Sequence, residues 1–503
     1  MNEEGIKRNS TDQRASLPGE PKCIICSRYG EYICDETNDD ICSLQCKQTL
    51  LTNATRVAAI PAKDECFYVR EPGGGSSFSS TDDDAQSLRS KLEIHVHCAA
   101  SIPPPALTFT SCGLPPKLLL NLETAGYDFP TPIQMQAIPV ALTGKSMLAS
   151  AETGSGKTAS YLVPIVTRCA SYRFEHPSEE KTPLAMVLAP TRELCVQVEE
   201  QAKILGMGMP FKTALVVGGD PMPGQLYRIQ QGIELIIGTP GRLLDLLTKH
   251  SVKLDDVLMF VVDEVDCMLQ RGFRDQVMQI FQALPQPQVL LFSATVSKEV
   301  EKVGGILAKE MALISIGEPN RPNKAVNQIV IWVDAKRKKQ KLFEVLRSQN
   351  HFKPPAVVYV SSRVGADLLA NAITVVTGIK ALSIHGEKPM KERRDVMCSF
   401  LSGEVPVLVS TGVLGRGVDL LVVRQVIVFD MPNTVKEYIH VIGRASRMGD
   451  KGNAILFVNE DSRNLFPDLV PALKSCGAVI PKELINLTSR EVHNNNKKRK
   501  VGY

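Results

Sequence analysis

The chain has 503 residues, of which 44% are hydrophobic and 22% are charged. These values are typical of two or three globular domains, and they exclude a disordered or fibrous protein. The net charge is only +4, so a nucleic-acid site requires local clusters of Lys and Arg.

Two features of the sequence bear on where the protein acts. Residues Met1–Arg8 are polar and charged, unlike a secretory signal, and no apolar run has the length of a membrane helix. Outside one cluster the cysteines are scattered singly, which is typical of reduced thiols. We therefore expect an intracellular, reducing location in the nucleus or cytoplasm, with the nucleus slightly favoured, and no membrane partner.

The first recognisable unit is a cluster of five cysteines between Cys23 and Cys46. A Cys-x₂-Cys pair and a Cys-x₃-Cys pair, separated by a loop, can place four thiolates tetrahedrally around Zn²⁺. The segment is too short to bury a core, so the metal would supply its folding free energy, on the order of 10 kcal/mol. We predict one zinc ion held by Cys23, Cys26, Cys42 and Cys46; a reduced, metal-free cluster is the alternative.

From Thr108 onward, short apolar runs alternate with amphipathic stretches, which predicts parallel sheets covered by helices on both faces. The predicted fold class is α/β, with two tandem doubly wound parallel-sheet domains preceded by a small zinc-binding module. The predicted boundaries are a flexible N-terminus over 1–20, the zinc module over 21–55, a linker over 56–106, a first domain over 107–318, a hinge over 319–331, a second domain over 332–485 and a basic tail over 486–503.

A glycine-rich loop follows the apolar run Ser146–Ser150 in the first domain. Its backbone N–H groups can cradle a triphosphate, Lys157 can reach the β- and γ-phosphates, and the Thr158 hydroxyl can ligate Mg²⁺. The predicted nucleotide-binding residues of this loop are Ala151, Glu152, Thr153, Gly154, Ser155, Gly156, Lys157 and Thr158.

The sequence Asp-Glu-Val-Asp ends another apolar run, about a hundred residues later. Asp263 can hold the metal, and Glu264 can orient or deprotonate an attacking water. Because this acidic pair complements the glycine-rich loop, we predict nucleotide hydrolysis. In the second domain, Arg444 and Arg447 are three residues apart, so both guanidinium groups project from one face of a helix.

The order of these and further motifs over roughly residues 107–485 resembles the DEAD-box ATP-dependent RNA helicases. The motifs are GYDFPTPIQ, AETGSGKT, PTREL, Gly218-Gly219, TPGR, DEVD and SAT in the first domain, and VVYVSSR, IHGEKPMKERR, STGVLGRGVD and YIHVIGRASRMG in the second. The preceding cysteine cluster makes the chain most similar to the plant-type member with an N-terminal HIT-type zinc finger. The resemblance implies RecA-like domains.

The resemblance also implies roles for individual residues. Phe109 would stack on adenine, and the Gln134 amide would read the adenine edge, for which one donor and one acceptor are suited. Arg444 and Arg447 would act as arginine fingers on the γ-phosphate. Residues that would couple hydrolysis to RNA strain are Ser293, Ala294, Thr295, Asp266 and Asp419. Residues that would contact the RNA backbone are Pro190, Thr191, Arg192, Gly219, Thr239, Pro240, Gly241, Arg242, Arg393 and Thr411.

Together these roles predict an RNA-stimulated ATPase that clamps, bends and locally unwinds RNA, with ATP, Mg²⁺ and Zn²⁺ bound and a monomeric core. Its RNA binding would be largely independent of sequence, because backbone N–H groups, hydroxyls and Arg suit phosphates and sugars. HIT-type fingers usually bind proteins, so a protein partner is expected at the finger. In this finger Cys34 remains from a second ligand set, whereas Thr37 and Leu50 occupy expected ligand positions.

Several residues depart from the family pattern and leave alternatives open. Val265 replaces an alanine, Gly412 an aspartate, Met390 a glutamine and Val441 an arginine, while Ala445 and Ser446 alter the residues between the fingers. One alternative is a non-unwinding, ATP-gated RNA clamp or assembly scaffold recruited through the finger. Another is an ATPase directed by DNA or independent of nucleic acid. The tail residues Lys497–Lys500 suit either nuclear import or a solvated charged end.

Overall fold

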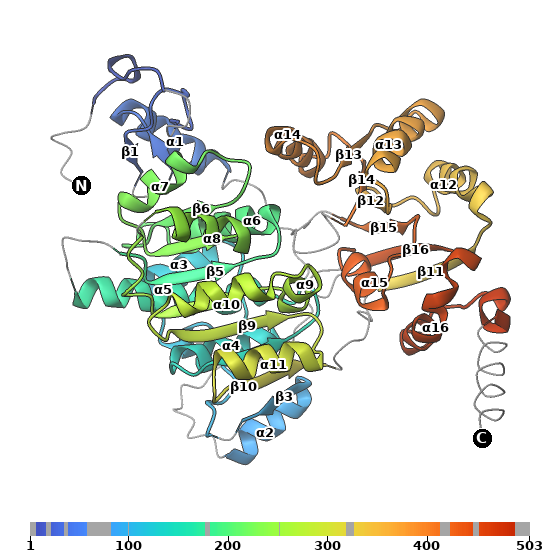
Figure 1. Cartoon of the computed structure of the whole chain (residues 1–503), viewed down its shortest axis with the longest axis horizontal. Helices are drawn as coiled ribbons and strands as arrows, with labels where there is room; N and C mark the ends of the chain where they lie inside the picture. The colour runs from blue at the N-terminus through green and yellow to red at the C-terminus, as the bar shows by residue number, and fades with distance from the viewer. Residues whose placement is uncertain are drawn as a thin grey trace, which may run out of the picture.

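The computed structural model describes residues 7–16, 22–34, 39–57, 82–98, 100–176, 182–250, 252–317, 326–412, 423–445 and 452–487. Within these ranges lie two large sheets and one small one (Figure 1). Arg447, Asp419 and the basic tail beyond residue 487 fall outside the described residues. No helix of the described chain is long and apolar enough to cross a bilayer.

The first large sheet has eight strands in the order β3-β10-β4-β9-β8-β5-β7-β6. Every neighbouring pair is parallel except β3 with β10. The strands are β3 (Ile94–His97), β4 (Met147–Ser150), β5 (Ala185–Leu188), β6 (Thr213–Val216), β7 (Leu235–Gly238), β8 (Met259–Val262), β9 (Gln288–Ser293) and β10 (Ala312–Ile316). The order of the strands differs from their order in the chain, as in a doubly wound fold.

The second large sheet has six strands, all parallel, in the order β11-β16-β15-β12-β14-β13. They are β11 (Val326–Trp332), β12 (Ala356–Tyr359), β13 (Ala381–Ile384), β14 (Val407–Ser410), β15 (Gln425–Val428) and β16 (Gly452–Val458). The predicted fold class, two tandem parallel-sheet domains after a small cysteine-rich module, is confirmed.

Helices cover both faces of each large sheet. In the first domain they are α3 (Pro116–Thr124), α4 (Pro132–Leu142), α5 (Lys157–Glu175), α6 (Arg192–Leu205), α7 (Met222–Gln230), α8 (Pro240–Lys249), α9 (Val265–Gln270), α10 (Arg274–Gln282) and α11 (Lys298–Leu307). In the second domain they are α12 (Lys338–Arg347), α13 (Arg363–Thr377), α14 (Met390–Leu401), α15 (Val435–Ile442) and α16 (Phe466–Ser475).

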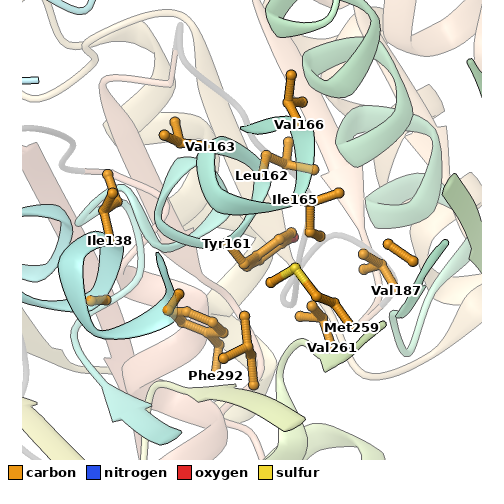
Figure 2. Packing of buried hydrophobic residues seen from close by; sticks show 14 of the residues in the cluster. Ile138, Tyr161, Leu162, Val163, Ile165, Val166, Val187, Met259, Val261 and Phe292 are labelled. Atoms are coloured by element: carbon orange, nitrogen blue, oxygen red, sulfur yellow. The ribbon is translucent and has the colours of Figure 1, made fainter. Parts of the chain in front are cut away.

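The core explains why the strands are continuous apolar runs. In β8, Met259 and Val261 face one cluster of buried side chains, whereas Phe260 and Val262 face another. Both faces of the sheet are therefore buried, so every position of such a strand is apolar. Figure 2 shows the first cluster around Tyr161 of α5, whose ring lies 5.2 Å from that of Phe292 in β9.

Two predicted boundaries near the N-terminus are wrong in part. Residues 82–97, predicted as linker, form α2 (Asp82–Lys91) and β3, and β3 pairs antiparallel with β10 at the edge of the first sheet. Residues 7–16, predicted as flexible, pair with the zinc module: Leu44 N donates to Lys7 O (2.9 Å) and Tyr29 N to Arg14 O (3.1 Å). Both segments gain their order from contacts distant in sequence.

The predicted hinge is also too long. Residues 326–331 belong to β11, where Val326 pairs with Gly452 and Trp332 with Val458. The second domain therefore starts at Val326, six positions before the predicted residue 332.

Candidate functional site

The glycine-rich loop joins β4 to α5 at the carboxyl edge of the first sheet. Gly154 and Gly156 have φ values of +82° and +92°, in the left-handed region that glycine adopts at little cost. Lys157 Nζ donates hydrogen bonds to the carbonyl oxygens of Ala151 (2.7 Å) and Glu152 (2.6 Å). The loop thus curls around the ammonium group, and N–H groups at the start of α5 form a cradle suited to phosphate.

The first turn of α4 holds this loop in place. Gln134 Oε1 accepts a hydrogen bond from Thr131 N (2.9 Å), while its Nε2 donates to Gly156 O (3.1 Å). Thr131 Oγ1 donates to Ser155 O (2.7 Å). A Cβ on Gly156 would lie 2.4 Å from Gln134 Nε2. Only glycine therefore allows the close approach between α4 and the loop.

Phe109 lies in the core of the first domain. Its side chain is 5% exposed, and its ring packs edge to face with Tyr127 at 6.4 Å. Residues Thr110–Cys112 continue from it as a short 3-10 helix.

Two carboxylates follow β8. Asp263 Oδ2 accepts a hydrogen bond from the Tyr161 hydroxyl (3.0 Å), and Oδ1 accepts one from Glu264 N (2.8 Å). Burial and the neighbouring Glu264 charge raise the pKa of Asp263 to about 6, against the opposing effect of Lys157. Glu264 has φ +50°, and this left-handed residue turns the chain from β8 into α9.

The second domain reaches this pocket through the turn after α15. Arg444 Nη2 lies 3.6 Å from Glu264 Oε1, and both side chains are buried. At Gly443, an added Cβ would lie 2.0 Å from Thr153 Oγ1 of the glycine-rich loop. A cavity of about 510 Å³ lies here, and its lining includes Thr153, Gly154, Gly156, Lys157, Thr158, Asp263, Glu264 and Arg444. The predicted phosphate-binding residues, the acidic pair and Arg444 are therefore brought together.

The other aspartate of the Asp-Glu-Val-Asp segment joins the two domains. Asp266 Oδ2 accepts a hydrogen bond from Thr295 N (3.0 Å) and forms another with His440 Nε2 of α15 (3.1 Å). Ser293 Oγ donates to Thr295 O (2.7 Å). The segment Ser293–Thr295, which includes Ala294, is therefore linked to the second domain through the Asp266 carboxylate.

The loops predicted to contact RNA lie along one edge of the first sheet. Strands β5, β7 and β6 are neighbours, and the loops follow their carboxyl ends. Thr191 Oγ1 caps α6 by accepting from Leu194 N (3.3 Å). Arg242 Nη2 donates to Asp220 O (2.6 Å) and its Nε to Gln225 Oε1 (3.2 Å). The edge includes Pro190, Thr191, Arg192, Gly219, Thr239, Pro240, Gly241 and Arg242.

The second domain faces this edge with α14 and the end of β14. Arg393 forms an ion pair with Glu193 at the start of α6, and both side chains are buried. Next to it, Arg394 Nη2 lies 3.0 Å from Asp220 Oδ2. Thr411, which follows β14, is 7% exposed. Residues predicted to contact the RNA backbone therefore lie on both sides of the interface between the two domains.

The cysteine cluster has the geometry of one metal site. The sulfur atoms of Cys23, Cys26, Cys42 and Cys46 all lie within 4.8 Å of one another. Three of the sulfur–sulfur distances are 3.3, 3.5 and 3.7 Å. Four thiolates tetrahedral around Zn²⁺ at about 2.3 Å lie about 3.8 Å apart, so this donor set fits zinc. Cys34 is buried but is not a member of the cluster.

Three residues of the site received no role from the sequence. His440, Tyr161 and Glu193 are each defined by a partner that is distant in the chain. The spacing Thr131-x-x-Gln134 did carry a readable signal, since it is the pattern of a helix capping box.

Comparisons with known proteins give matches along most of the chain. The model described as DEAD/DEAH box helicase matches residues 131–303, and that described as Helicase conserved C-terminal domain matches 337–449. A third, HIT zinc finger, matches 19–48.

Curated relatives match over nearly the whole length. The chain is 79% identical to "DEAD-box ATP-dependent RNA helicase 41" of Arabidopsis thaliana, with 100% of each chain covered. It is 60% identical to the protein of the same name from Oryza sativa subsp. japonica, covering 97% of this chain and 92% of the relative. It is 45% identical to "Probable ATP-dependent RNA helicase DDX59" of Mus musculus, covering 96% and 79%.

Solved structures agree with the fold. S. cerevisiae Dbp5 bound to RNA and ADP BeF3 matches with a TM-score of 0.65 and 28% identity, covering 76% of this chain and 100% of that one. Mss116 bound to ssRNA and UDP-BeF matches with a TM-score of 0.66 and 24% identity, covering 75% and 80%, a likeness that shows the fold alone.

Proposed function

Since the chain belongs to the DEAD-box ATP-dependent RNA helicases, carrying a HIT zinc finger, we propose that it hydrolyses ATP to clamp, bend and locally unwind RNA. The observation that carries this proposal is the approach of Arg444 to Glu264 across the two domains. A triphosphate held on the loop between β4 and α5 would be contacted by groups from both domains, so its hydrolysis would loosen the interface.

Each group at the pocket then has a defined task. Lys157 and the loop N–H groups hold the phosphates. Gln134 and Phe109 are both buried and do not line the pocket, so they would bind the adenine only after turning out of their present contacts. Glu264 orients the attacking water and accepts its proton, and Arg444 with Arg447 stabilises charge on the transferring phosphoryl group. Thr158 and Asp263 offer the hard oxygen ligands that Mg²⁺ prefers. When bound, the ion neutralises charge on the phosphates.

RNA would lie along the edge formed by the loops after β5, β7 and β6, with Arg393 and Thr411 opposite. Support comes from Dbp5, a structural neighbour that was solved bound to RNA and ADP BeF3. RNA phosphates would compete with Glu193 for Arg393 and with Asp220 for Arg394. Asp266, Thr295 and His440 would transmit domain closure to the RNA side, with Ser293, Ala294 and Asp419 assisting.

The test is strand displacement from a short RNA duplex, with and without ATP, alongside ATPase assays with RNA and DNA of the same sequence. RNA stimulation with ATP-dependent displacement supports the proposal. Stimulation by DNA to the same extent overturns the preference for RNA, because only RNA offers the 2′-hydroxyl.

A second candidate, a non-unwinding ATP-gated clamp, is favoured by one specific observation. Val441, which stands where the family has arginine, is 3% exposed and packs in the core of the second domain. It therefore offers no charge to either substrate. Retention of RNA with ATP, without displacement of the duplex, would identify this alternative.

We also propose a protein partner for the finger and a monomeric core. Ile24, between the ligand residues Cys23 and Cys26, is 57% exposed, which suits an apolar contact. A monomer suffices because one chain supplies both sides of the ATP pocket. Crosslinking with and without Ile24→Ser would test the protein contact at the finger. Sedimentation of the purified protein by analytical ultracentrifugation would test the monomeric state.

The basic run at 497–500 supports nuclear residence, which imaging of the tagged chain would test.

A further inference from the structure

The cysteine-rich module lies against the first domain beyond the β6 edge of the sheet, beside α7 (Figure 1). Its elements are β1 (Tyr32–Ile33), β2 (Asp40–Ile41) and α1 (Leu44–Val57). Asp40 Oδ1 accepts a hydrogen bond from Arg228 Nη1 (2.7 Å), and Asp39 Oδ1 accepts one from Lys203 Nζ (3.1 Å). The Tyr29 hydroxyl lies 3.4 Å from that of Tyr227.

These contacts reach α6 and α7, each near its C-terminal end. Lys203 is in the last turn of α6, and Tyr227 and Arg228 are in the last turn of α7. The opposite ends of the two helices carry the proposed RNA-contacting loops. Thr191 and Arg192 begin α6, and Gly218–Asp220 precede α7. The module therefore joins the two helices that extend from the proposed RNA site.

A continuous set of hydrogen bonds links α7 to the rest of that site. Gln225 Nε2 donates to Val217 O (2.8 Å), and its Oε1 accepts from Arg242 Nε (3.2 Å). Arg242 also donates to Asp220 O (2.6 Å), and Asp220 Oδ2 lies 3.0 Å from Arg394 of the second domain. A shift of α7 would thus move the loop after β6 and Arg242 together.

Backbone hydrogen bonds connect the cysteine cluster to the docking residues and their neighbours. Cys23 N donates to Arg28 O (2.8 Å) and Ile24 N to Asp40 O (3.0 Å), which ties the first cysteine pair to both sides of the docking surface. Arg14 stacks on the Tyr29 ring, with its guanidinium carbon 4.0 Å from the ring centroid. Because the module is too small for a core of its own, these positions depend on the cluster of four sulfurs.

We propose that the HIT finger is an internal brace, docked through Tyr29, Asp39 and Asp40, that fixes α6 relative to α7 and so positions the two RNA-contacting loops. The inference rests on the proposed RNA-clamping function. It gives the finger a role within the chain, in addition to the protein contacts proposed for its exposed side.

The test uses the full chain with Asp40→Lys, Arg228→Glu and the double variant. Affinity for a fluorescein-labelled oligouridine is measured in the presence of a nonhydrolysable ATP analogue, together with basal ATPase activity and zinc content. Each single variant should raise the RNA Kd about tenfold, which equals a loss of about 1.4 kcal/mol, and leave basal ATPase unchanged. The double variant should recover most of the lost affinity, because it restores an ion pair with reversed charges.

The two single variants change the net charge in opposite directions. A simple electrostatic effect would therefore weaken RNA binding by Arg228→Glu and strengthen it by Asp40→Lys, and that pattern would overturn the brace. Unchanged Kd values in both variants with zinc retained would also overturn it. The control is Lys380→Glu, which breaks the exposed Lys380–Glu404 pair of the second domain. If the wild-type chain does not retain RNA with the analogue, the proposed function fails, separately from the brace.

Discussion

His440 Nε2 lies 3.1 Å from Asp266 Oδ2, and this hydrogen bond joins α15 of the second domain to α9 of the first. Both side chains are buried. Burial alone would raise the pKa of Asp266, but the charge and hydrogen bond of His440, with hydrogen bonds from Thr295 and Cys267, hold that pKa well below its usual range. The carboxylate therefore stays charged when the domains meet.

His440→Ala should lower the RNA-stimulated kcat about tenfold to a hundredfold, because hydrogen bonds to charged groups contribute about 1.5–3 kcal/mol. ATP affinity should change little, since His440 does not line the phosphate pocket. Steady-state ATPase and nucleotide-binding assays check both. The control is His176→Ala, at an exposed residue after α5. A normal kcat in His440→Ala would show that the contact does not couple the domains.

Glu264→Gln should abolish turnover, by about a thousandfold or more, while ATP-dependent RNA retention persists. Asp263 and Lys157 remain in this variant, so phosphate and metal binding are kept. Single-turnover hydrolysis and filter binding with labelled RNA separate the two properties. Glu310→Gln, at an exposed position of the first domain, is the matched control. Near-normal hydrolysis by Glu264→Gln would remove this residue from the proposed role.

The sheets could be predicted from the sequence because strands such as Met259–Val262 are buried on both faces and read as apolar runs. The site loops could be predicted because glycine-rich and acidic segments follow those runs directly. By contrast, β3 has the short sequence IHVH and, among the strands that the structure describes, only β10 as a neighbour, so it lacks that signal.

The contacts between distant segments could not be read from local patterns. The pairing of His440 with Asp266 spans 174 positions, and that of Arg228 with Asp40 spans 188. Each depends on how separately folded units dock, and periodicity within one element carries no record of that docking. The same reason explains why residues 7–16 were predicted to be flexible although they pair with the zinc module.

Gly156→Ala should weaken ATP binding strongly, by about a hundredfold, because the added Cβ meets Gln134 Nε2 at 2.4 Å on a backbone with φ +92°. The matched control is Gly144→Ala, since Gly144 has φ +82° with nothing within 4 Å of an added Cβ. Both variants should lose about 1–3 kcal/mol of stability through backbone strain. Thermal unfolding measures that shared loss, and only Gly156→Ala should lose nucleotide affinity. Equal ATP affinity in the two variants would contradict a tight contact between α4 and the loop.

Zinc content should follow the four clustered thiols and not Cys34. We expect about one zinc ion per chain in the wild type and in Cys34→Ser, and none in Cys23→Ser, because Cys34 is not part of the cluster. Metal analysis of the purified proteins measures the ratio. Cys34→Ser is the matched control because both thiols are buried. Loss of zinc from both variants, or two ions per wild-type chain, would show that the finger uses a second ligand set.

The affinity for Mg²⁺-ATP should fall as the pH drops below about 6, the raised pKa of Asp263. Above this pH the carboxylate is charged and can bind the metal; below it the group is protonated, and affinity should fall up to tenfold per pH unit. An ordinary aspartate would keep its charge down to about pH 4. Tyr161→Phe removes a donor that stabilises the charged form, so the midpoint should move to higher pH. Isothermal titration calorimetry between pH 5 and pH 8 would measure both midpoints, and a lower midpoint in Tyr161→Phe would contradict the role given to that hydroxyl.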